Sequence, residues 1–170
     1  MFGTRRALIP VAIALACFAT AASADVLYTA SMDGAQNLPE PVKTDATGAV
    51  QFAVSADGKS VAYKVTVSHL NNASAADLHL GQPSQNGPLV AKLFPNGTTA
   101  KKGEYSGVLA EGTLTGADLI GPLTGATLAD LVEELKVGNV YVNVHTNDGT
   151  DPPNSGPGDY RLGEIRGQLK

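Results

Sequence analysis

Two residues suited to metal or acid–base chemistry stand two positions apart in the segment Asp77-Leu78-His79. In a β-strand, side chains two positions apart point to the same face, so the Asp77 carboxylate and the His79 imidazole would project side by side. Such a pair can bind a metal ion, or can act as a base that is oriented by an acid. The exposed polar face of an ordinary strand produces the same pattern and stays open as the alternative.

A second histidine lies near the end of the alternating run Val140 to Thr146. Period two places three valines on one face of this run and Tyr141, Asn143 and His145 on the other. The valines suit the core, so His145 is expected beside polar neighbours at a strand end. From there it could share a metal ion with His79 or hydrogen-bond a neighbouring loop. His69 is predicted to be a turn residue at the end of a hairpin strand.

A third polar face follows from the segment Gly163 to Leu169, in which Glu164, Arg166 and Gln168 alternate with apolar residues. Two interpretations of this face are open. It is an exposed, ion-paired surface of small energetic value, or it serves a nearby site. In the second case Arg166 supplies a fixed cation that attracts an anion, and Arg166 or Glu164 supports the metal ligands from behind.

Strand-length runs with period-two alternation predict a mainly β fold: an antiparallel Greek-key or immunoglobulin-like β-sandwich, or a barrel, with one or two short helices. The pair Asp57-Gly58 suits a tight turn, so the runs on either side of it should form a hairpin. The expected strands are Val26–Ala30, Ala49–Val54, Val61–Val67, Asp77–Leu80, Leu89–Phe94, Tyr105–Leu114, Val140–His145 and Glu164–Leu169.

Helical spacing is confined to the segment after Thr127, where leucines and a valine recur on one face and Asp130 completes a capping box. We predict a helix of about two turns there that ends at Gly138. A single helical turn is predicted at Thr115–Ile120. The polar stretch Asn147–Leu162 is predicted to be a surface loop.

The first 24 residues have the organisation of a secretory signal peptide: Arg5 and Arg6, the apolar run Ala7–Ala19, and small residues up to Ala24. Cleavage after Ala24 would leave one domain, residues 25–170, outside the cytoplasm, either periplasmic or secreted. The only cysteine, Cys17, leaves with the signal peptide. The net charge falls from −4 to −6, because two arginines and no acids are removed, and this argues against nucleic acid or a membrane surface as a partner.

Four motifs together resemble the CHRD domain family across nearly the whole mature chain. They are Leu38–Val42 followed by Ala46–Gly48, Asp77–Gly81 followed by Asn86–Val90, Gly138–Thr146, and Gly163–Leu169. The resemblance implies a Greek-key or immunoglobulin-like β-sandwich in an exported, single-domain protein. It implies no established activity.

The family usually has His-Ile-His where this chain has Asp77-Leu78-His79, and two histidines on one strand with a distant third resemble the copper site of copper/zinc superoxide dismutases. Here Asp77 holds the first position, which leaves His79, His145 and a carboxylate. Such a set can bind copper, which we expect first, or zinc or ferrous iron.

Three functions therefore stay open. The first is an exported metal-binding module whose ligands are His79, His145 and Asp77. The second is a non-catalytic structural or interaction module that binds a protein partner. The third is a redox enzyme similar to superoxide dismutase, for which the sequence specifies no substrate. Hydrolase and kinase motifs are absent from the sequence.

Overall fold

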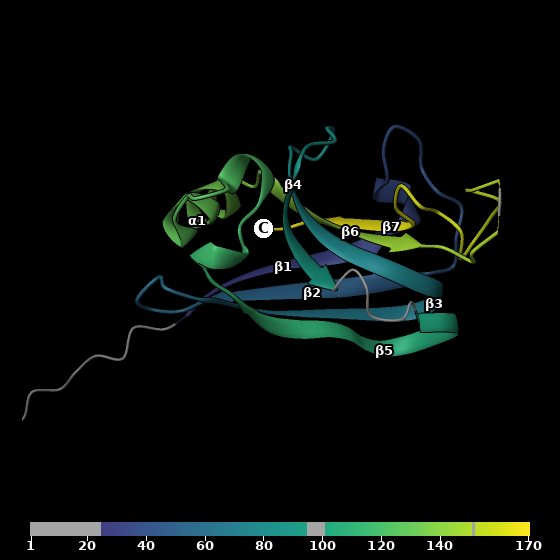
Figure 1. Cartoon of the computed structure of the whole chain (residues 1–170), viewed down its shortest axis with the longest axis horizontal. Helices are drawn as coiled ribbons and strands as arrows, with labels where there is room; N and C mark the ends of the chain where they lie inside the picture. The colour runs from purple at the N-terminus through teal and green to yellow at the C-terminus, as the bar shows by residue number, and fades with distance from the viewer. Residues whose placement is uncertain (1–24, 95–100, 151) are drawn as a thin grey trace, which may run out of the picture.

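The computed structural model of the chain describes residues 25–94, 101–150 and 152–170 (Figure 1). The predicted signal peptide, residues 1–24, lies outside the described residues, and its export function stays a prediction. Within the described part of the chain, no helix is long and apolar enough to cross a membrane.

The fold is mainly β, as predicted, with seven strands and one α-helix in the described residues. The strands are β1 (Val26–Asp33), β2 (Thr47–Val54), β3 (Val61–Leu80), β4 (Leu89–Phe94), β5 (Lys101–Leu114), β6 (Val140–Thr146) and β7 (Ile165–Gln168). The helices are α1 (Leu128–Lys136) and the short 3-10 turns η1 (Gly34–Gln36), η2 (Gly116–Asp118) and η3 (Gly121–Leu123).

Five antiparallel strands close into a barrel. The sheet runs β2-β1-β7-β6-β3, and β2 also pairs with β3, which completes the ring. The remaining strands, β4 and β5, each pair with β3 outside this ring. The barrel form of the prediction is thus confirmed, and the hairpin of β2 and β3 around Asp57-Gly58 is confirmed with it.

β3 is one strand of 20 residues, so the prediction of separate strands at 61–67 and 77–80 is wrong. Its first half pairs with β2 and β5, and its second half pairs with β6 and β4. His69 and Asn72 have φ of 53° and 52° and lie where the ladder to β5 shifts register. His69 therefore lies at an irregularity within the strand, and not in the turn that we predicted.

The barrel interior is apolar and tightly closed. All three valines of β6 are fully buried, as are Phe52 and Leu78. The leucines of α1 belong to the same core, and the predicted capping box of Thr127 and Asp130 is present. Figure 1 shows α1 beside one end of the barrel strands.

The outer faces of β3, β6 and β7 are polar, yet they are also buried. Glu164 and Arg166 are each 1% exposed, so the interpretation of an exposed ion-paired face is wrong. The segments between the strands account for this burial. Hydrogen bonds tie Gln82 and Gln85 to Arg166, and Gly158 to Glu164, across the outer face of the barrel. A buried polar layer therefore lies between the barrel and its loops.

Candidate metal centre

Asp77, His79 and His145 meet in this polar layer. Asp77 and His79 project from the same face of β3, as their spacing predicts, and the β3–β6 ladder pairs Asp77 directly with Asn143. His145 lies two residues beyond Asn143, so its side chain emerges on the same face. One ligand atom from each of the three residues lies within 4.8 Å of the other two. The two imidazole ring centres are 6.5 Å apart.

Main-chain carbonyls hold both imidazoles in place. The Nδ1 atom of His79 is 3.0 Å from the carbonyl oxygen of Gly87, and Nδ1 of His145 is 3.0 Å from that of Arg161. A carbonyl oxygen only accepts hydrogen bonds, so each Nδ1 carries the proton and the neutral ring keeps its lone pair on Nε2. Both Nε2 atoms are buried and have no hydrogen-bond partner. Histidines that bind metals are oriented in this way in many proteins.

The Asp77 carboxylate faces these imidazoles without a full set of partners. Its Oδ2 lies 3.3 Å from Nε2 of His145, and its Oδ1 is buried with no hydrogen bond. Two atoms that carry lone pairs repel at this distance unless a proton or a cation lies between them. A metal ion bound between the two atoms would remove this repulsion.

Burial lowers the pKa of His79 below its ordinary value of 6.5, and His145 and Arg166 lower it further, while the Gly87 carbonyl and Asp77 oppose the shift. The lowered pKa means that the ring is neutral at neutral pH. A neutral ring is the form that can donate a lone pair to a metal ion.

Tyr141 and Arg166 support His79 from the side. The Tyr141 ring stacks on the imidazole with 5.0 Å between centres and an angle of 11° between planes. The Arg166 guanidinium carbon lies 3.7 Å from the centre of the Tyr141 ring. Its Nη2 also donates to the carbonyls of Gln85, at 2.8 Å, and Gln82, at 3.2 Å. Arg166 thus contacts both structures that position His79: the stacked tyrosine and the loop that carries Gly87.

Glu164 ties together the segments around His145. Its carboxylate accepts hydrogen bonds from the hydroxyls of Thr44 and Thr146, each at 2.6 Å, and from the main-chain nitrogen of Gly158 at 2.8 Å. The Asn37 side chain donates to the main-chain carbonyl of Glu164 at 2.6 Å. Glu164 therefore fixes the loop that carries Arg161, whose carbonyl orients His145.

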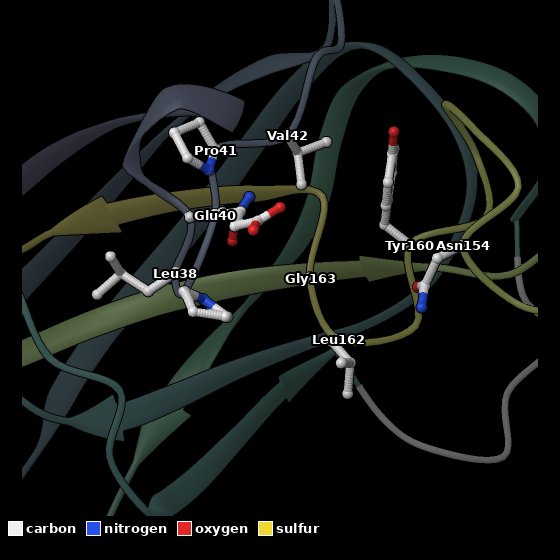
Figure 2. Close-up of a pocket in the computed structure, with 10 residues that line it drawn as sticks. Leu38, Glu40, Pro41, Val42, Asn154, Tyr160, Leu162 and Gly163 are labelled. Atoms are coloured by element: carbon white, nitrogen blue, oxygen red, sulfur yellow. The ribbon is translucent and has the colours of Figure 1, made fainter.

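A depression of about 280 Å³ opens beside His79 and His145 and is lined by both imidazoles, Tyr141 and Asn143. Its rim includes Leu38, Pro39 and Leu162, which also line a neighbouring cavity of about 410 Å³. In Figure 2, Leu38 and Leu162 come from the two chain segments that border this second cavity. The imidazoles are half-buried and line the depression, while their Nε2 atoms are themselves buried.

Sequence reasoning brought the three ligands to one site and proposed Arg166 and Glu164 as their supports, but it did not identify the main-chain carbonyls that orient the imidazoles. Tyr141 and Asn143 were expected on the face of His145, and period two was sufficient for that prediction. The carbonyls of Gly87 and Arg161 had no signal in the sequence, because any residue type offers the same main-chain oxygen.

Comparison with known proteins identifies a family. Residues 28–153 match the family model described as the CHRD domain. No curated protein and no solved structure matches the chain significantly.

Proposed function

This chain belongs to the CHRD domain family, and we propose that its domain is an exported module that binds one transition-metal ion, copper first, through His79, His145 and Asp77. The proposal concerns binding, and it names no substrate.

One observation carries it: two imidazoles place buried Nε2 atoms that lack a hydrogen-bond partner close to the Asp77 carboxylate, whose Oδ1 is also buried without one. Leaving polar atoms buried without partners destabilises a fold by about 1–3 kcal/mol for each group. A cation at the common point would satisfy all three groups at once. The carbonyls of Gly87 and Arg161 already hold both rings in the tautomer that a metal requires.

The ligand set favours copper among the available ions. Imidazole nitrogen binds copper, zinc and iron, and the affinity of a given site for divalent ions peaks at copper. Two imidazoles with one carboxylate also bind zinc or ferrous iron, so those ions are the natural competitors.

Titration of the dialysed mature protein with Cu(II) tests the proposal. We expect one equivalent to bind, with imidazole nitrogen hyperfine structure in the electron paramagnetic resonance spectrum. His79→Gln and His145→Gln should each abolish this binding, because each removes a ligand and leaves two. Zinc and ferrous iron, titrated in the same way, would rank the ions.

The chain provides its own control in His69. This histidine is exposed, and its Nδ1 contacts the neighbouring Ser68 hydroxyl at 3.0 Å. His69→Gln should leave the stoichiometry and the spectrum unchanged. If His79→Gln still binds one equivalent with wild-type affinity, or if His69→Gln loses it, the site is not the one that we propose.

Export is tested separately. Expression of the whole chain in a bacterial host, followed by fractionation and N-terminal sequencing, should yield a mature protein outside the cytoplasm that begins at Asp25. Recovery of the intact chain in the cytoplasm would contradict export but would leave the metal site untouched.

A further inference from the structure

Asn143 occupies the centre of the polar layer. It lies on β6, where the ladders pair it with Asp77 on one side and with Arg166 on the other. Its side chain is 7% exposed and lines the same depression as His79 and His145. Paired residues of antiparallel strands project to the same face, so the Asn143 carboxamide stands beside the Asp77 carboxylate.

The orientation of this carboxamide is fixed by its neighbours. Nδ2 donates a hydrogen bond to the carbonyl oxygen of Leu162 at 3.1 Å. Because a carbonyl accepts only, this contact assigns the nitrogen and leaves Oδ1 as the free end. Oδ1 is buried and has no hydrogen-bond partner.

Gly163 provides the space that the carboxamide fills. A Cβ atom at position 163 would collide with the Asn143 side-chain nitrogen and oxygen. The backbone of Gly163 also has φ of 125°, a conformation that other residues rarely adopt. The chain therefore accommodates the carboxamide in a place where its oxygen has no donor.

The metal ligands offer no donor to this oxygen. Asp77 is an acceptor when ionised, and the two imidazoles direct their Nδ1 protons to Gly87 and Arg161. A donor must therefore come from the depression. Three protein ligands leave a position at a metal ion for water, and such a water carries two acidic protons.

Building on the proposed metal site, we infer that Asn143 is a positioning residue whose Oδ1 accepts a hydrogen bond from a water molecule bound to the metal. A bound water donates this bond more strongly than hydroxide does. Asn143 therefore favours the protonated form and raises the pH at which the water loses a proton.

The test follows the Cu(II) absorption and paramagnetic resonance spectra of the loaded protein as a function of pH. In Asn143→Ala, the pH midpoint of water deprotonation should fall by about one unit, the equivalent of one hydrogen bond. In Asn143→Asp, the added negative charge should raise the midpoint instead. The added charge raises the midpoint in Asn143→Asp whatever the role of Asn143, so the fall in Asn143→Ala is the decisive result.

Two further variants separate the inference from loosening of the loop. Asn154→Ala removes the bond between its Oδ1 and the Arg161 nitrogen, 3.1 Å long, from the same loop, and it should leave the midpoint unchanged. Gly163→Ala displaces the carboxamide without altering it and should lower the midpoint as Asn143→Ala does.

An unchanged midpoint in metal-loaded Asn143→Ala overturns the inference, and so does an equal shift in Asn154→Ala. Complete loss of metal from Asn143→Ala would make Asn143 a ligand, which also overturns it. Failure of the wild-type protein to bind any metal would instead refute the proposed function itself.

Discussion

Replacement of Arg166 tests whether the residues that position His79 contribute to metal affinity. The guanidinium is 1% exposed, and it donates to Gln85, Gln82 and Asn86 over 2.8–3.3 Å. Arg166→Met removes these bonds and the charge, while it keeps a long apolar stem. Arg166→Lys keeps the charge but loses the planar fork that reaches several acceptors at once.

Each hydrogen bond from a charged donor contributes about 1.5–3 kcal/mol, and a desolvated cation–π contact such as that with Tyr141 contributes about 2 kcal/mol. Dehydration of the guanidinium offsets much of this gain. We therefore expect Arg166→Met to lose about 2–4 kcal/mol of unfolding free energy, which lowers Tm by about 10 °C in a domain of this size.

The loop that carries Gly87 and the stacked Tyr141 both lose their anchor, so His79 loses its orientation. Copper affinity should fall about 10–100-fold, the range typical of residues behind metal ligands. Calorimetric titration at a temperature where both variants stay folded measures this directly. If attraction by charge is the role of Arg166, Arg166→Lys should keep wild-type affinity. If positioning is its role, Arg166→Lys should fail as Arg166→Met does. Folded Arg166→Met with unchanged affinity would refute the positioning of His79 by Arg166.

Three more measurements address the same layer. Glu164→Gln replaces one acceptor oxygen by an NH2 group, which faces the hydrogen-bond donors that the carboxylate now accepts from. Tm of the metal-free protein should fall by an amount equivalent to about 2–3 kcal/mol. An unchanged Tm would show that this network contributes little to stability. An NMR titration of the metal-free protein should place the pKa of His79 below 6.5. As the pH falls, the His79 side chain is protonated first in the unfolded chain, because its pKa is lowered in the folded protein. The free energy of unfolding should therefore be highest above pH 6.5 and should decrease as the pH falls toward the lowered pKa. His79→Gln should remove this pH dependence. Copper at 100 times its Kd should stabilise the wild-type protein by about 2.7 kcal/mol, raising Tm by about 5–10 °C, and EDTA should reverse the shift; Asp77→Asn should reduce it.

The sequence was sufficient for the strands and for the faces of their side chains, because period two is a local property. Val140 to Thr146 shows this most clearly, with its valines in the core and His145 outside it. The continuity of β3 was not predictable from local signals. The segment 68–76 holds His69 and Asn72, residues typical of turns, and only the partners on both sides of β3 keep it extended.

Burial of the outer face was the second feature beyond the reach of local patterns. The residues Glu164, Arg166 and Gln168 read as a solvated surface, since polar residues on alternate positions usually face water. Much of what covers them is contributed by segments far away in sequence: Asn37, Thr44 and the loop that contains Gln82 and Gln85. Long-range packing of this kind has no sequence periodicity. The sequence therefore could not predict which segments bury this face, or which main-chain carbonyls orient the imidazoles.

The position of the ligands outside the barrel explains how one small domain can hold both a stable core and a polar site. The interior of this five-stranded barrel is filled by apolar side chains, among them those of β6, so an ion placed there would need a cavity. The outer face, closed by loops, provides burial without disturbing that packing. Closure of the barrel depends on strand pairing and on the inward face, and neither includes the Asp77, His79 or His145 side chains. Loss of a ligand should therefore remove the metal and leave the fold, so each ligand variant can be compared with the metal-free wild-type protein.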